Sequence, residues 1–141
     1  MTDIGRVYID HIGIAASSLE EGSKFWRLLG LAQGEHDEVN EEQGVVTRFF
    51  EVEASKSRPP MLEILEPTGK DTPIGKFLSK RGPGIQQLCL RVENIQQVID
   101  HLLENDIEMI DKSPRQGVGG AIIAFVHPKS TGGVLVELTQ H

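Results

Sequence analysis

The chain has one cysteine, Cys89, among its 141 residues. A lone thiol cannot form an intramolecular disulfide, so the sequence favours a reducing compartment, and we expect a cytoplasmic protein. Hydrophobic runs are also short, because no segment approaches the roughly 20 apolar residues of a transmembrane helix. The first residues, Met1 to Arg6, lack the apolar core of a signal peptide. The sequence therefore predicts no association with a membrane.

Positive charge is scarce: 14 Lys and Arg residues stand against 21 Asp and Glu residues, for a net charge of -7. Such a chain repels a phosphate backbone, so nucleic acid is not an expected partner, whereas a small-molecule substrate is. The remaining composition is ordinary for a globular protein, with 38% hydrophobic and 25% charged residues. The length suits one domain, 1–141, with a core of its own.

A carboxylate interrupts the aliphatic stretch from Gly132 to Thr139, which has the composition of a strand. Side chains alternate between the faces of a strand, so Val136 and Leu138 share one face and Glu137 lies on the other. A carboxylate among apolar neighbours is costly unless it is paired, protonated or bound to a metal. Glu137 is therefore a candidate site residue.

Residue patterns predict the other elements. Ser18 and Glu21 match a capping box, and the helix after them has an apolar stripe that we expect in the core. Thr72-Pro73 opens a second helix with proline at its favoured first position, and Asn94 is suited to cap a third. Strands are expected over 7–16, 45–52, 61–66, 85–92, 121–126 and 132–139.

The pattern occurs twice. His11 precedes the cap Ser18 by as many residues as Gln87 precedes the cap Asn94, and Glu63 matches Glu137 in the middle of a late strand. Two copies of one strand–helix–strands unit are the economical interpretation. We expect an α+β fold in which two βαβββ modules, about 6–67 and 85–140, pair into a curved mixed sheet with an enclosed cleft. Residues 68–84 would form a short helical connector.

Four polar residues occupy equivalent places in these copies: His11, Glu63, Gln87 and Glu137. Each alternates with aliphatic residues that would pack on the helices, so the polar side chains would face the cleft. Imidazole, carboxylate and amide oxygen ligands suit a divalent cation such as Co²⁺, Ni²⁺, Mn²⁺, Zn²⁺ or Mg²⁺. For any one of these residues a satisfied core histidine or a paired glutamate is the simpler interpretation, but four at equivalent positions favour a metal site.

The sequence resembles the vicinal oxygen chelate superfamily (glyoxalases, bleomycin-resistance proteins and dioxygenases), and within it the methylmalonyl-CoA epimerases. The resemblance covers nearly the whole chain. It is carried by the segments 9–15 (IDHIGIA), 62–67 (LEILEP), 71–78 (DTPIGKFL) and, most specifically, 127–138 (HPKSTGGVLVEL). It implies the paired-module fold and a divalent metal held by His11, Glu63 and Glu137.

Two positions differ from the epimerase pattern. Gln87 stands where those enzymes have a histidine ligand, and an amide oxygen is a weaker donor to late transition metals than imidazole. Thr47 stands where they have a glutamate, one of two proposed bases, and threonine cannot take an α-proton at neutral pH. Glu51 or Glu53 could replace that carboxylate, although a solvated strand end is the simpler interpretation for both.

The resemblance implies an isomerase that moves a proton at the carbon α to a thioester carbonyl, through an enolate that a metal stabilises. Glu137 is the matching base, and Thr47 and Lys129 are expected to contact the substrate. Two alternatives stay open. One is a glyoxalase I-type lyase acting on a thiol adduct, and the other is a metal-free binding protein of the bleomycin-resistance type. The family often forms dimers, so a homodimer is also expected.

Overall fold

The structure is a computed structural model that describes residues 3–52 and 60–141. The chain divides into two compact units. We call His11–Gln86 the N-terminal unit, and Met1–Asp10 together with Gln87–His141 the C-terminal unit. The described residues form an α+β fold, as predicted. Within them no helix is long and apolar enough to cross a membrane. The module bounds, the curvature and the enclosed cleft stay predictions.

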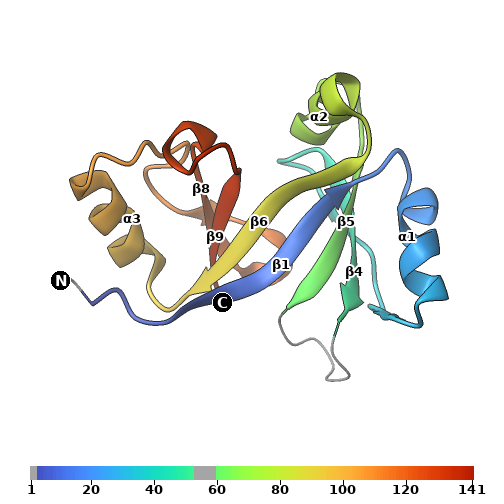
Figure 1. The fold of residues 1–141 in the computed structure, drawn as a ribbon, viewed down its shortest axis with the longest axis horizontal. Coiled ribbons are helices and arrows are strands. Elements are labelled where there is room, and N and C mark those ends of the chain that lie inside the picture. Colours follow the sequence, from blue (N-terminus) through green and yellow to red (C-terminus); the bar gives the residue numbers. More distant parts are fainter. Residues whose placement is uncertain (1–2, 53–59) are drawn as a thin grey trace. The chain divides into compact units, whose positions relative to one another are not determined.

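The N-terminal unit is built around two long antiparallel strands, β4 (Val45–Glu51) and β5 (Met61–Pro67), which are drawn in green in Figure 1. The first strand, β1 (Val7–Ala15), pairs with β5 in parallel. Two short strands, β2 (Ala32–Gln33) and β3 (Glu38–Asn40), pair with β4. The unit also contains helices α1 (Leu19–Leu28) and α2 (Pro73–Arg81).

The C-terminal unit repeats this plan. Its first strand, β6 (Gly84–Val92), pairs in parallel with its last, β9 (Val136–Gln140). Between them in sequence come helix α3 (Ile95–Glu104) and strands β7 (Arg115–Gln116) and β8 (Ile122–Val126). Strand β8 is antiparallel to both β9 and β7. The short turns η1 (Val118–Gly120) and η2 (Pro128–Ser130) flank β8.

In each unit the strands have an apolar face that packs on a helix. In the N-terminal unit, Leu19 of α1 packs in a buried cluster with residues of β4, β5 and the segment just after β1: Ala16, Phe50, Leu62 and Ile64. In the C-terminal unit, Ile95, Val98 and Ile99 of α3 pack in the equivalent cluster with Val92, Met109, Ala124, Val126 and Leu138. The aliphatic residues therefore pack on the helices, as predicted, and the alternating residues lie on the other face.

The start of the main helix is stabilised in the same way in both units. Ser18 accepts a hydrogen bond from the backbone of Glu21 at 3.1 Å, which confirms the predicted cap of α1. The backbone N–H of Leu19, the residue directly after Ser18, donates to the side chain of Glu66 at 2.8 Å. In the other unit Asn94 caps α3, and Ile95 donates to Gln140 at 2.8 Å. Glu66 and Gln140 both lie three residues after the candidate glutamate of their strand, so the duplication extends to individual contacts.

Two expectations, one about the packing of a helix and one about the start of a strand, differ from the structure. The stripe on α1 is only partly in the core, because Phe25 is 59% and Leu29 60% exposed, whereas Trp26 packs against the cluster. The last strand begins at Val136, later than the predicted 132. Gly132 and Gly133 have φ values of 79° and 102°, which bend the backbone out of an extended conformation.

Candidate functional site

The polar face of the N-terminal unit contains the pair His11 and Glu63. Nε2 of His11 lies 3.2 Å from Oε1 of Glu63, and both side chains are buried, at 8% and 5% exposed. Strand pairing explains the contact: Gly13 is the partner of Glu63, so His11 comes two residues earlier on the adjacent strand and on the same face. Phe49, the partner of Glu63 on β4, packs edge-to-face on the His11 ring at 5.5 Å. The structure therefore brings two of the predicted ligands together.

The C-terminal unit contains the pair Gln87 and Glu137. Nε2 of Gln87 donates a hydrogen bond to Oε1 of Glu137 at 2.8 Å, and each residue is 7% exposed. Cys89 is the partner of Glu137 on β6, so Gln87 again comes two residues before the partner. Phe125 is the partner of Glu137 on β8. The strand register and the cross-strand phenylalanine of the first pair therefore have counterparts here, with an amide in place of the imidazole.

The polar face of the N-terminal unit also holds Thr47. It is 1% exposed, and it shares a face with Phe49 because the two alternate on β4. Its partner on β5 is Leu65, two residues after Glu63. Among the described residues, none gives the Thr47 hydroxyl oxygen a hydrogen bond. A buried hydroxyl in this state is rare, and it asks for an explanation.

Sequence reasoning missed a charged cluster in the C-terminal unit. Arg91 donates from Nε to Oδ1 of Asp10 at 2.7 Å, and its terminal nitrogen lies 2.7 Å from the same oxygen. His141 approaches this oxygen at 3.6 Å, and Asp10 is 2% exposed. The sequence offered one signal for this cluster. Side chains alternate between the two faces of a strand, which puts Arg91 on the same face of β6 as Gln87 and Cys89.

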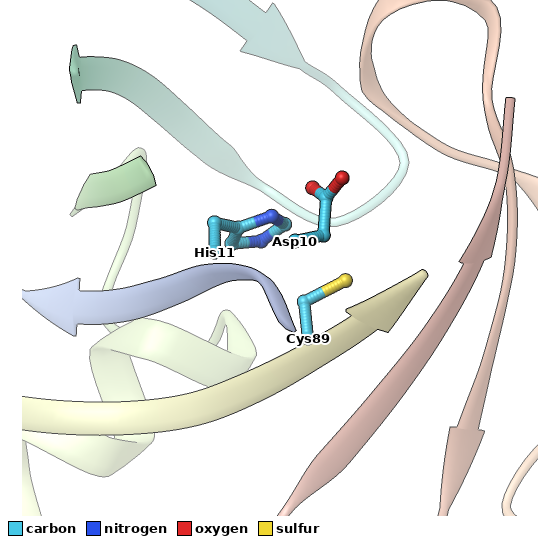
Figure 2. Close-up of side chains that lie close together, drawn as sticks. All are labelled: Asp10, His11 and Cys89. Carbon is cyan, nitrogen blue, oxygen red and sulfur yellow. The ribbon is translucent and has the colours of Figure 1, made fainter. Parts of the chain in front are cut away.

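Figure 2 shows Asp10 and Cys89, together with His11, the residue after Asp10 in β1. The Asp10 carboxylate and the buried Cys89 thiol come within 4.8 Å, and both are residue types that can bind metals. Because the Arg91 guanidinium already binds Asp10, we interpret this carboxylate as half of an ion pair that anchors β1 to β6 in the C-terminal unit.

Other candidates lie outside these pairs. Lys129 is exposed in η2, where its backbone N–H donates to Nδ1 of His127 at 3.0 Å. Glu51 is partly exposed at the end of β4, and Glu53 lies outside the described residues. The use of Lys129 and Thr47 by a substrate stays a prediction, as does the joining of the two pairs into a four-ligand site.

The fold and the paired polar residues define a class of protein. Residues 10–125 match the model of the Glyoxalase/Bleomycin resistance protein/Dioxygenase superfamily. The chain belongs to this superfamily, whose other name is vicinal oxygen chelate.

The similar proteins define a branch of the superfamily. A methylmalonyl-CoA epimerase of Dictyostelium discoideum is 35% identical over 138 residues, which are 97% of this chain and 80% of the relative. The uncharacterized protein YqjC of Bacillus subtilis (strain 168) is 38% identical over 133 residues, 94% of this chain and 91% of its own. The structure of a methylmalonyl-CoA epimerase in complex with methylmalonyl-CoA and NH4+ has a TM-score of 0.88 at 33% identity, covering 96% and 95% of the two chains. The relatives thus support an enzyme of the epimerase kind.

Proposed function

We propose that the chain is a divalent-metal-dependent isomerase that moves a proton at the carbon α to a thioester carbonyl, with methylmalonyl-CoA or a related α-carboxy acyl-CoA as substrate. The observation that carries the proposal is the repeated polar pair, His11 with Glu63 and Gln87 with Glu137, at the same register of both units. Similarity to methylmalonyl-CoA epimerases over nearly the whole chain supports the substrate class.

The residues fit a divalent metal. His11 offers an imidazole nitrogen, Glu63 and Glu137 offer carboxylate oxygens, and Gln87 offers an amide oxygen. This mixed nitrogen and oxygen set suits a cation of borderline or hard character, such as Co²⁺, Ni²⁺, Mn²⁺, Zn²⁺ or Mg²⁺. When bound, the metal would polarise the substrate oxygens and so stabilise the enolate.

The chain's own residues remove the proton and orient the site. We assign proton removal at the α-carbon to the Glu137 carboxylate, which is held in place by the amide of Gln87. Phe49 packs on the His11 ring and Glu63 lies 3.2 Å from its Nε2, so both neighbours orient the imidazole. The electron pair of the broken C–H bond moves to the thioester oxygen. A proton from the solvent, added at the opposite face of the α-carbon, then restores the C–H bond and the thioester with inverted configuration, and Glu137 releases the proton that it took.

A metal titration combined with deuterium exchange tests the proposal. Protein purified without chelator is analysed for metal and titrated with Co²⁺, Ni²⁺, Mn²⁺ and Zn²⁺, and each epimer of methylmalonyl-CoA is then incubated in deuterated water. We expect a stoichiometric ion and deuterium at the α-carbon. His11→Ala should lose the ion, and Glu137→Gln should slow exchange by at least about a hundredfold. Glu104→Gln, an exposed change on α3, is the matched control.

Two results would contradict the proposal. One is the absence of stoichiometric binding for every ion, which would point to a metal-free binding protein. The other is a bound ion without exchange at the α-carbon of either epimer. We do not propose the glyoxalase I-type activity, because the relatives reported above give it no support.

A further inference from the structure

Thr47 lies at a position where the fold does not require a hydroxyl. In the N-terminal unit, Thr47 is the β4 partner of Leu65, two residues after the candidate glutamate of β5. The equivalent residue of the C-terminal unit is Ile123, which is the β8 partner of Thr139, two residues after Glu137. Ile123 is 3% exposed and Thr47 is 1% exposed. The same buried place thus accepts an aliphatic side chain in one unit and carries a hydroxyl in the other.

The described neighbours of Thr47 along its face of β4 and across on β5 are apolar. Val45 and Leu65, its neighbours along β4 and across to β5, belong to an apolar cluster with Ala15 and Ile74. Within the part of the chain that the structure describes, the Thr47 oxygen makes no hydrogen bond. Valine has nearly the same shape and would avoid the penalty for burying an unsatisfied hydroxyl. Packing therefore does not account for threonine here.

We propose that the Thr47 hydroxyl binds the free carboxylate of the acyl-CoA substrate and selects α-carboxy thioesters over those without this group. Thr47 lies on the face that holds His11 and Glu63, because its pair with Leu65 is two positions along the β4–β5 ladder from the pair that contains Glu63. A hydroxyl on this face can donate a hydrogen bond, and a carboxylate is a stronger acceptor than a thioester carbonyl. The inference rests on the proposed function, because it names the substrate group recognised by the same site.

Binding measurements with two ligands test the role of Thr47. Racemic methylmalonyl-CoA carries the carboxylate, and turnover between epimers leaves its composition unchanged. Propionyl-CoA has the same acyl chain without the carboxylate. Both are titrated calorimetrically into the wild-type protein and into Thr47→Val, Thr47→Ala and Thr47→Ser, with Co²⁺ present throughout.

We expect Thr47→Val and Thr47→Ala to weaken methylmalonyl-CoA binding about tenfold or more, because a hydrogen bond to a charged group is lost. Thr47→Ser keeps the hydroxyl and should bind within about threefold of the wild type. Propionyl-CoA affinity should stay unchanged in all variants. Without ligand, Thr47→Val should unfold at the same temperature as the wild type or at a higher one.

The possible failures are distinguishable. If the wild type binds methylmalonyl-CoA and Thr47→Val binds it equally well, the role of Thr47 is refuted while the proposed function stands. Equal weakening of both ligands, with a lower unfolding temperature, would mean that the hydroxyl is structural and would also refute the role. If the wild type binds neither ligand and exchanges no α-proton, the proposed function fails and the inference fails with it.

Discussion

The two units share a backbone plan and differ in the chemistry that each presents. In the N-terminal unit an imidazole faces Glu63 at 3.2 Å, and in the C-terminal unit an amide faces Glu137 at 2.8 Å. Both carboxylates have a phenylalanine as their partner on the adjacent antiparallel strand, Phe49 and Phe125. The strand register and the cross-strand phenylalanine are therefore properties of the repeated unit, whereas the residue facing the carboxylate has diverged.

The helices differ as well. Helix α3 buries three aliphatic residues, whereas α1 buries only Leu19 and Ser23. Around α1, charged residues supply further contacts: Arg48 binds Asp37 at 2.8 Å and approaches Glu20 at 3.8 Å. Apolar burial stabilises more than surface ion pairs do, so α3 depends on apolar packing to a larger extent than α1 does.

The largest expected difference between the units is in how much two equivalent phenylalanines contribute to the free energy of unfolding. Phe125 is 8% exposed, whereas Phe49 is only partly buried and packs on the His11 ring. Phe125→Ala should lower the free energy of unfolding by about 3 kcal/mol or more, and Phe49→Ala by about half as much. Urea unfolding of both variants measures this, and equal losses would show that the two positions are packed alike.

A smaller change would make the C-terminal pair like its counterpart. Gln87→His places an imidazole beside Glu137, and imidazole is the better donor to late transition metals. We expect Co²⁺ and Zn²⁺ to bind about tenfold more tightly, with little change for Mg²⁺, as measured by calorimetry. Gln86→His is the matched control, because the side chain of residue 86 lies on the face of β6 opposite to that of Gln87. Tighter Mg²⁺ binding, or an equal gain in the control, would contradict the assignment of Gln87 as a ligand.

The smallest expected effect concerns the ion pair near α1. A hydrogen bond from Arg48 lowers the pKa of Asp37 below its ordinary value of 3.8. The pair therefore stabilises the fold fully above that value, and its contribution disappears as the pH falls through the lowered pKa. Because the Asp37 side chain is 35% exposed, Asp37→Asn should cost only about 0.5 kcal/mol near neutral pH. Urea unfolding should show this difference shrinking in acid and at high salt, and a difference independent of pH would refute it.

Much of the fold could be predicted from the sequence, because local signals were strong. The caps Ser18 and Asn94 and the alternation around Glu63 and Glu137 are visible in a few adjacent residues. The exposed Phe25 could not be predicted, because hydrophobic periodicity does not show how far a covering sheet extends along a helix. The Asp10–Arg91 pair was also missed, because it joins residues that are 81 positions apart.

The parallel pairing of first and last strands has a consequence for folding. Gln87 and Glu137 meet although 50 positions separate them, and His11 and Glu63 meet across a similar interval. Neither pair can form before its unit has closed that long loop, a step that carries a large entropic cost and slows folding. We therefore expect the polar pairs to be among the last features to assemble, and a metal bound by them would stabilise each unit only after its strands have paired.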